Sequence, residues 1–290
     1  MKELVVISGK GGTGKTSLVA SLACLAERPV IADCDVDAAD LHLVLVPQVK
    51  ERHDFYGGHE AVVRPDVCTG CGVCAEFCRF EAISETRTSE GNIVFQVDPI
   101  NCEGCGVCVR FCPVQAIDFP ECLCGEWMVS ETPYGPMVHA RLGVAAENSG
   151  KLVSMVRREA ARIASEKKHS RIIIDGPPGI GCPVIASITG ASRVLVVTEP
   201  TVSGKHDLER VLSLAKHFDI PAAVCVNKWD LNPSMTEKIE TFATALGSEV
   251  VGRIRYDRAV TLAQMQARAV VETDAPCAED IKNVWHALHF

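Results

Sequence analysis

The sequence lacks the features that would assign the protein to nucleic acid or to a membrane. It has no basic excess, because 29 lysines and arginines are outnumbered by 37 acidic residues and the net charge is −8. A surface that neutralises phosphates favours basic residues, so we expect neither a nucleic-acid partner nor an anionic membrane. No apolar run reaches the roughly 18 residues that a membrane span needs. The N-terminus runs directly into a predicted strand without a signal-peptide layout, and we expect a cytoplasmic protein.

Cysteine, in contrast, is abundant, with 15 residues in a chain of 290. The reducing cytosol does not maintain a disulfide framework, so this number favours metal ligation. Eight of the cysteines form two runs offset by 34 residues, and segments 68–83 and 102–117 are identical at 10 of 16 positions. A duplicated unit of this size is typical of a bacterial-type ferredoxin. We therefore predict a small α+β ferredoxin-like domain over residues 61–120.

Each run has the spacing C-x₂-C-x₂-C-x₃-C, in which three thiolates bind one cluster and the fourth binds the other. The predicted ligands are Cys68, Cys71, Cys74 and Cys112 for one [4Fe–4S] cluster, and Cys102, Cys105, Cys108 and Cys78 for the second. Structural zinc is disfavoured, since Cys₄ zinc sites normally use two separated CxxC pairs. Paired clusters predict an electron relay, and a purely structural role for them remains the alternative. The other apolar-flanked cysteines are expected in the core: Cys24, Cys34, Cys182, Cys225 and Cys277.

Outside the insert, short apolar runs alternate with segments of helical periodicity. Strands are expected at 4–7, 30–32, 172–174, 194–197 and 222–226, and helices at 15–27, 150–168, 204–217, 234–246 and 257–268. This alternation predicts an α/β fold with a mostly parallel, doubly wound sheet. The ferredoxin-like unit would interrupt that domain, which then comprises residues 1–60 and 121–290.

A phosphate-binding loop follows the first predicted strand. Residues 9–16 read GKGGTGKT, which matches the P-loop pattern G-x-x-x-x-G-K-[ST] between a strand and a helix. Its backbone N–H groups would wrap the phosphates, Lys15 would reach the β and γ phosphates, and Thr16 would bind Mg²⁺. The predicted nucleotide contacts are Gly9, Gly11, Gly12, Thr13, Gly14, Lys15, Thr16 and Ser17.

Acidic residues follow two predicted strands at the same edge of the sheet. Asp175 ends the run 172–174 and fits the Walker B position that holds Mg²⁺, usually through water. Asp33, Asp35 and Asp37 follow the strand at 30–32, and Asp35 is the best candidate for positioning the attacking water. For Asp37 and Asp40 a capping or solvated-loop role is as plausible.

Lys10 departs from a plain P-loop. Together with the motifs DCDVD at 33–37 and DGPPG at 175–179, KGGTGKT resembles the MinD, Mrp and nitrogenase iron protein group of deviant Walker A ATPases. The resemblance implies ATP hydrolysis and a dimer, either of identical chains or with a related ATPase, in which Lys10 reaches the partner's phosphates. With the insert, the chain is similar to MinD-superfamily ATPases that carry a ferredoxin domain, including the stretches TEPT at 198–201 and ENSGK at 147–151.

The resemblance also bears on two features whose roles the residues leave open. Related Mrp-type and nitrogenase iron proteins hold a bridging cluster, so Cys122 and Cys124 are either extra, labile or intersubunit ligands or ordinary thiols. Residues 227–230 read NKWD, the NKxD pattern that reads guanine in GTPases, whereas Asn227 alone can serve adenine. The resemblance favours ATP over GTP, and we place residues 255–257 beside the same pocket.

The last predicted helix has an apolar face of Ile281, Val284, Trp285 and Leu288. It resembles the membrane-targeting tail of MinD, but a membrane-surface helix should be rich in Lys or Arg, and this one has Glu279 and Asp280. We expect it to pack on the domain. The functional prediction is an ATPase coupled to electron transfer toward an unknown redox partner. A cluster carrier or scaffold and a redox-regulated positioning ATPase are the alternatives.

Overall fold

The computed structural model describes residues 1–143 and 149–290, in two compact units. The first comprises Met1–His53, Glu126–Leu142 and Ser149–Phe290 and is called the sheet unit; the second, called the cysteine unit, spans Asp54–Gly125. The cysteine unit is longer than the predicted range of 61–120. Its first boundary falls within strand β3 (Gln48–His59), and its second falls within strand β8 (Glu121–Thr132). Glu147 and Asn148 of the predicted ENSGK stretch lie outside the described residues.

A nine-stranded sheet forms the sheet unit, in the order β13-β12-β11-β1-β10-β2-β9-β8-β3. The strands are β1 (Lys2–Ser8), β2 (Val30–Asp33), β9 (Gly135–Leu142), β10 (Arg171–Pro178), β11 (Arg193–Thr198), β12 (Ala222–Asn227) and β13 (Glu249–Ile254). All neighbours from β13 to β9 pair in parallel. The predicted parallel α/β sheet is confirmed, and β3, β8, β9 and β13 extend it beyond the five expected strands.

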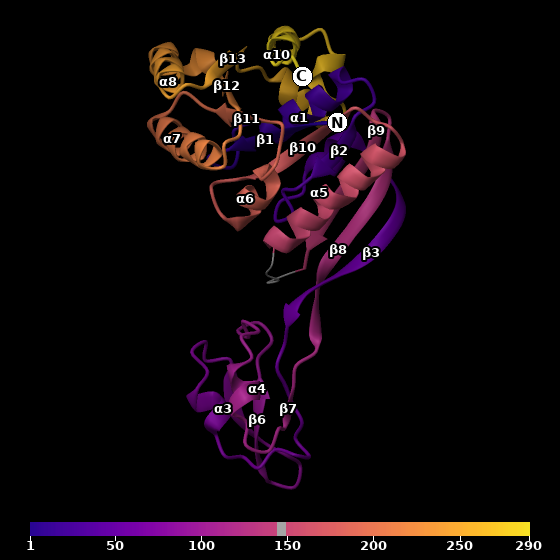
Figure 1. The fold of residues 1–290 in the computed structure, drawn as a ribbon, viewed down its shortest axis with the longest axis vertical. Helices are drawn as coiled ribbons and strands as arrows, with labels where there is room; N and C mark the ends of the chain where they lie inside the picture. The colour runs from indigo at the N-terminus through magenta and orange to yellow at the C-terminus, as the bar shows by residue number, and fades with distance from the viewer. Residues whose placement is uncertain (144–148) are drawn as a thin grey trace. The chain divides into compact units, whose positions relative to one another are not determined.

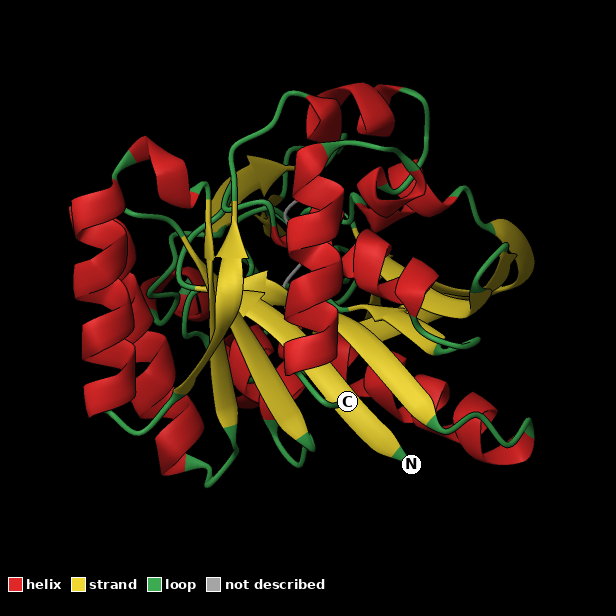
Figure 2. Cartoon of the chain, turned by 90° about the horizontal axis from the view of Figure 1, so that it is seen from above, coloured by secondary structure: helices red, strands yellow, loops and turns green. Residues whose placement is uncertain are grey.

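Helices cover both faces of this sheet (Figures 1 and 2). They are α1 (Lys15–Leu25), α2 (Leu41–Leu45), α5 (Ser149–Glu166), α6 (Cys182–Ile188), α7 (Val202–His217), α8 (Pro233–Ala245), α9 (Ala259–Met265) and α10 (Pro276–Ala287), with short 3₁₀ turns at Trp229–Leu231 and Val270–Glu272. Side chains alternate along each strand. Leu4 and Val6 therefore pack with α1 and α10 on one face, while the equally buried Val5 and Ile7 point to the other.

The C-terminal helix α10 packs on the sheet as expected, with Ile281, Val284 and Leu288 buried. No described helix combines the length and apolarity that crossing a membrane requires. The expectation that Cys182 lies in the core is wrong. It is the first residue of α6 and is exposed, because the Gly-rich turn before it keeps the helix start at the surface. Cys34, Cys225 and Cys277 are buried, and Cys24 is half-buried.

The cysteine unit repeats a short helix in each half, and it is described here by itself. Its elements are β4 (Val62–Val63), α3 (Val73–Glu76), β5 (Ile83–Arg87), β6 (Ile93–Val97), α4 (Val107–Phe111) and β7 (Ile117–Asp118). β4 pairs with β7, and β5 with β6, both antiparallel. Equivalent glycines, Gly72 and Gly106, precede the two helices with φ of 80° and 71°, a left-handed backbone that favours glycine.

Candidate functional site

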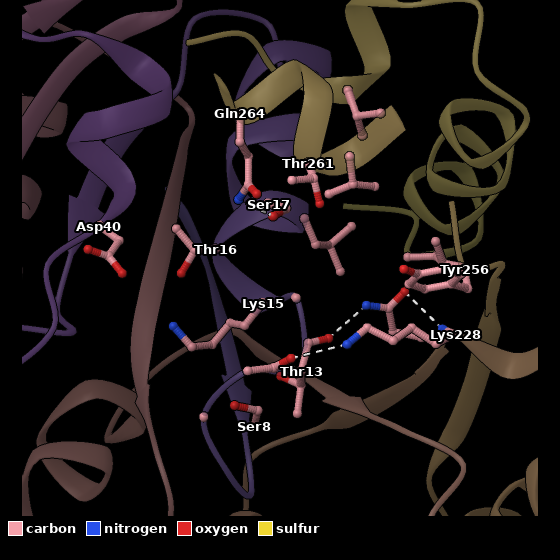
Figure 3. A pocket seen from close by; sticks show the side chains of 18 of the residues that line it. Ser8, Thr13, Lys15, Thr16, Ser17, Asp40, Lys228, Tyr256, Thr261 and Gln264 are labelled. Carbon is pink, nitrogen blue, oxygen red and sulfur yellow. Dashed lines mark hydrogen bonds between the residues drawn. The ribbon is translucent and has the colours of Figure 1, made fainter. Parts of the chain in front are cut away.

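A cavity of about 440 Å³ opens where the strands of the sheet unit end. The P-loop forms one wall, and the other lining residues include residues near the ends of β2, β12 and β13 and residues of α9 (Figure 3). The predicted residues that line it are Gly11, Gly12, Thr13, Gly14, Lys15, Thr16, Ser17, Asp35 and Asn227. Ligands of open α/β sheets bind at the carboxyl ends of the strands, so this cavity is the candidate nucleotide site.

The P-loop backbone requires its glycines at two places. Gly14 has φ of 85°, and a Cβ there would lie 2.4 Å from the side-chain nitrogen of Asn227. Gly9 lies against α7, where a Cβ would come within 2.3 Å of the Cβ of Asp207. Helix α1 begins at Lys15, so its first N–H groups and its dipole face the cavity, an arrangement that stabilises a bound phosphate.

Lys15 is buried between two of the predicted acidic residues. Its Nζ donates to Asp175 and, at 3.2 Å, to Oδ2 of Asp35. The Lys15 side chain is 6% exposed and that of Asp175 1%. Burial alone lowers the pKa of Lys15, but the negative charges of Asp175 and Asp35 outweigh it and the pKa lies above its usual value. The structure thus brings together three residues that the sequence analysis named, and their roles in nucleotide binding and catalysis stay predictions.

Asp33 completes an acidic cluster. It lies directly opposite Asp175 in the register of β2 and β10, and its Oδ1 accepts the N–H of Asp35 at 3.2 Å. Burial, reinforced by Asp175, raises the pKa of Asp33 well above its usual value. Burial likewise raises the pKa of Asp35, although Lys15 counteracts it. The sequence pointed to Asp33 only as part of a run, because its meeting with Asp175 depends on strand order.

Three buried oxygens of the site have no hydrogen-bond partner among the described residues: Oδ2 of Asp175, Oδ2 of Asp33 and Oγ1 of Thr13. Buried polar atoms are almost always satisfied in folded proteins, so these atoms suit a ligand that supplies partners. Carboxylate and hydroxyl oxygens are the ligands that Mg²⁺ takes, often through water. The residues present therefore fit Mg²⁺ together with a phosphate group.

Lys10 and Lys228 share one carboxylate, that of Glu199. Nζ of Lys10 lies 3.4 Å from Oε2 of Glu199, and Lys228 pairs with Oε1 while donating to the carbonyl of Gly12 at 3.3 Å. Glu199 thus links the P-loop to the ends of β11 and β12. The TEPT stretch contains Glu199, but a lone glutamate after a strand gave no signal for this role. The contact of Lys10 with a second chain stays a prediction.

The residues predicted to contact the base, Asn227 and Asp230, also form hydrogen bonds within the protein. Nδ2 of Asn227 donates to the carbonyl of Thr13 at 2.7 Å, so this side chain braces the P-loop. Oδ1 of Asp230 accepts the N–H of Tyr256 at 2.7 Å, which engages one oxygen that a guanine reader would need free. Tyr256 and Asp257 line the cavity as expected, and Arg255 does so while pairing with Asp280 at 2.7 Å. Gln264, which the sequence analysis missed, donates to Oγ of Ser17 at 2.7 Å.

Two small cavities of the cysteine unit are lined by separate cysteine sets. One set is Cys68, Cys71, Cys74 and Cys112, and the other is Cys78, Cys102, Cys105 and Cys108. All cysteines are free thiols. Among the described residues, no group of three or more His, Cys, Asp or Glu side chains could hold a single metal ion. Each set supplies four thiols, the number and type of donor that a [4Fe–4S] cluster takes, and the binding of clusters there stays a prediction.

Cys122 and Cys124 lie on β8, outside both cavities. Sγ of Cys124 is buried and donates to the carbonyl of Gly57 at 2.6 Å. Cys122 is half-buried. Its burial raises the pKa of its thiol, and the neighbouring Cys124 raises it further. Cys124 thus has a partner within the unit, and a ligand role for the pair stays a prediction.

Similar proteins match along most of the chain. Residues 4–270 match the model of the CobQ/CobB/MinD/ParA nucleotide binding domain. The uncharacterized protein MJ0578 of Methanocaldococcus jannaschii is 35% identical over 235 residues, 79% of each chain. MJ0579 of the same organism is 23% identical over 264 residues, 80% of this chain and 83% of its own.

Solved structures agree with this at the level of the fold. The cell division ATPase MinD of Pyrococcus furiosus has a TM-score of 0.58 at 17% identity and covers 99% of this chain and 98% of its own. MinD of Pyrococcus horikoshii, complexed with Mg-ADP, has a TM-score of 0.59 at 16% identity and covers 99% and 95%. The P-loop ATPase prediction is thereby confirmed at the level of the family: this chain belongs to the CobQ/CobB/MinD/ParA family of nucleotide-binding proteins.

Proposed function

We propose that this chain is an ATP-hydrolysing iron–sulfur protein, in which ATP-dependent association of two chains controls electron transfer through two [4Fe–4S] clusters. The observation that carries the proposal is the lining of the two cavities in the cysteine unit. Each is lined by the four cysteines that the crossed ferredoxin pattern assigns to one cluster, three from one run and the fourth from the other.

The nucleotide half of the proposal rests on the charges around Lys15. In phosphoryl transfer the protein supplies positioning and charge stabilisation rather than covalent chemistry. Lys15 would exchange its carboxylate partners for the β and γ phosphates, and Thr16 with Asp175 would hold Mg²⁺. Asp35, 3.2 Å from Nζ of Lys15, would position the attacking water. We expect ATP rather than GTP, because Asp230 already bonds the backbone of Tyr256.

The cluster half rests on the eight cysteines and their backbone. Bound [4Fe–4S] clusters supply one-electron redox chemistry, with potentials that depend on burial and on hydrogen bonds to sulfur. Cys74 and Cys108 are the most buried ligand candidates, and burial raises the pKa of both thiols. A metal binds the thiolate form of cysteine, so ligation would have to displace the proton from each of these thiols.

A second function fits the same fold. The similarity to MinD structures over nearly the entire chain favours a positioning ATPase whose dimerisation the clusters would regulate. A cluster carrier or scaffold would instead need labile ligands, for which Cys122 and Cys124 are the candidates. Serine at both positions should then lower the iron content per chain; unchanged iron would exclude that role for the pair.

The test begins with anaerobic reconstitution and an analysis of iron and sulfide per chain, where two clusters require eight of each. A redox titration followed by EPR is then run with and without Mg·ATP on Asp35→Asn, which we expect to slow hydrolysis. A shift in midpoint potential would show the coupling that electron gating demands. Equal potentials in both states would refute ATP-controlled transfer and favour the positioning ATPase. Lys15→Ala is the control: it should abolish turnover and leave the iron content intact.

A further inference from the structure

The carboxylate of Glu199 holds two lysines of the sheet unit at once. Its side chain follows β11 and is 14% exposed, whereas the side chains of Lys10 and Lys228 are 35% and 29% exposed. Oε2 of Glu199 lies 3.4 Å from Nζ of Lys10, and Oε1 pairs with Nζ of Lys228. Neither lysine forms an ion pair with another described residue. One carboxylate therefore balances two positive charges beside the P-loop.

The two lysines are held to different extents. Nζ of Lys228 also donates to the carbonyl of Gly12 at 3.3 Å, so this side chain has a second attachment to the P-loop. Nζ of Lys10 has only Glu199 as a polar partner in the part of the chain that the structure describes. Of the two ammonium groups, that of Lys10 is therefore the one that can leave the carboxylate by breaking a single interaction.

Lys10 also lies outside the nucleotide cavity of its own chain. Every P-loop residue from Gly11 to Ser17 lines that cavity, whereas Lys10 and Glu199 are not among the lining residues. The backbone of Lys10 is held, because its carbonyl accepts the hydroxyl of Ser8 at 2.8 Å. Rotation of the side chain therefore decides where the ammonium lies. A partly exposed lysine that does not face its own cavity is placed to meet a phosphate of another chain.

Glu199, in contrast, is anchored through its backbone. Its carbonyl accepts the N–H of Thr201 at 2.8 Å. Helix α7 packs directly on this carbonyl, since a Cβ added at Gly204 would lie 2.4 Å from the oxygen. The carboxylate is therefore a fixed point beside the P-loop, and the side chain of Lys10 is the part that moves when the two separate.

We propose that Glu199 is a positioning residue for Lys10, which it retains on its own chain until the phosphates of ATP bound to a second chain replace the carboxylate. Release leaves no isolated charge in the protein, because Glu199 keeps its pair with Lys228. Without nucleotide on the second chain, nothing competes with the carboxylate and Lys10 stays where it is. The inference rests on the proposed ATP-dependent association of two chains.

The proposal predicts that removing the carboxylate tightens association. A partly exposed ion pair changes an equilibrium about threefold. Two chains give up two such pairs when they associate, so the dissociation constant should change by the square of this factor, about tenfold. Sedimentation equilibrium of the reconstituted full-length chain carrying Asp35→Asn measures this constant in saturating Mg·ATP. Adding Glu199→Gln, which keeps the size and shape of the side chain, should lower the constant about tenfold.

Two matched variants show whether Lys10 carries the effect. Glu209→Gln makes the same change of charge on α7, at an exposed residue without an ion pair among the described residues, and should alter association less than about twofold. When Lys10→Ala is already present, Glu199→Gln should also have less than about a twofold effect, because no ammonium is left to release. An effect of Glu199→Gln that is equally large without Lys10 would overturn the proposal.

The remaining outcomes separate this inference from the function on which it rests. If the Asp35→Asn chain shows no association that depends on Mg·ATP, the proposed ATP-dependent association fails and the role of Glu199 fails with it. If that chain associates but Glu199→Gln behaves like Glu209→Gln, only the role of Glu199 is refuted. A fluorescent ATP analogue, titrated at chain concentrations too low for association, should bind Glu199→Gln within about threefold of the parent. A larger loss would overturn the proposal in favour of a role for Glu199 in bracing the P-loop through Lys228.

Discussion

The burial of Lys15 between carboxylates predicts that replacing it changes stability as well as hydrolysis. Lys15→Met removes the amine that pairs with Asp175 and Asp35 inside the protein. Breaking a buried ion pair by deleting one partner typically costs about 3–5 kcal/mol, because the remaining charge stays buried. The Lys15 and Asp175 side chains are 6% and 1% exposed, so solvent screening gives little relief. We expect about this loss at pH 8, together with loss of ATP hydrolysis.

The loss should depend on pH. Burial raises the pKa of Asp33 and Asp35 in the folded chain, and the charge of Lys15 partly opposes this. Without Lys15, the folded state binds protons more readily than the unfolded state, whose carboxyls titrate near 3.8. The variant therefore loses stability as pH rises from about 4 through the folded pKa values, by linkage. Its deficit relative to the wild type should be largest at pH 8 and smaller at pH 5.

Urea unfolding, followed by tryptophan fluorescence, measures the free energy of unfolding of the sheet unit, because Trp127, Trp229 and Trp285 all lie in that unit. The matched control is Lys238→Met, an exposed lysine of α8 without an ion pair among the described residues, expected within about 0.5 kcal/mol of wild type. Lys15→Met/Asp175→Asn should recover most of the loss. If Lys15→Met is as stable as Lys238→Met at pH 8, or the double variant recovers nothing, the buried-pair reasoning is refuted.

Two substitutions and one labelling experiment test further features of the structure. Asp33→Asn should raise the free energy of unfolding at pH 8 by about 1–3 kcal/mol, because the wild-type carboxyl has its raised pKa only in the folded state. Urea titrations should show this gain vanishing as the pH falls toward about 4. Asn227→Ala should weaken ATP binding about fivefold by equilibrium dialysis, since it removes the 2.7 Å bond to the P-loop; unchanged affinity would contradict that role. Iodoacetamide should label Cys182 rapidly and spare Cys225, whose pKa burial raises to about 12; equal labelling would contradict the burial of Cys225.

The strands that the sequence predicted are short runs of consecutive apolar residues, which the fold buries. Segment 172–174 is apolar at every position and lies in the first half of β10, and the runs at 194–197 and 222–226 likewise mark β11 and β12. β3 was missed because most of its side chains are exposed and its sequence contains Lys50, Glu51, Arg52, His53 and Asp54 in succession. Such a strand is fixed by its hydrogen bonds to β8 within the sheet rather than by an apolar pattern.

The parts of the site that the sequence predicted are those whose residues lie close together along the chain. The P-loop and the cysteine runs are recognisable because the essential residues of each motif lie within a few positions of one another. The backbone between these residues also belongs to the predicted binding site. The partners of Lys15 and Lys10 come from other strands: Asp175 lies 160 residues from Lys15, and Glu199 follows β11. Their meeting depends on β1 lying between β10 and β11. Strand order decides which carboxylate faces which lysine, so the charge balance of the site follows from the fold and not from the motif.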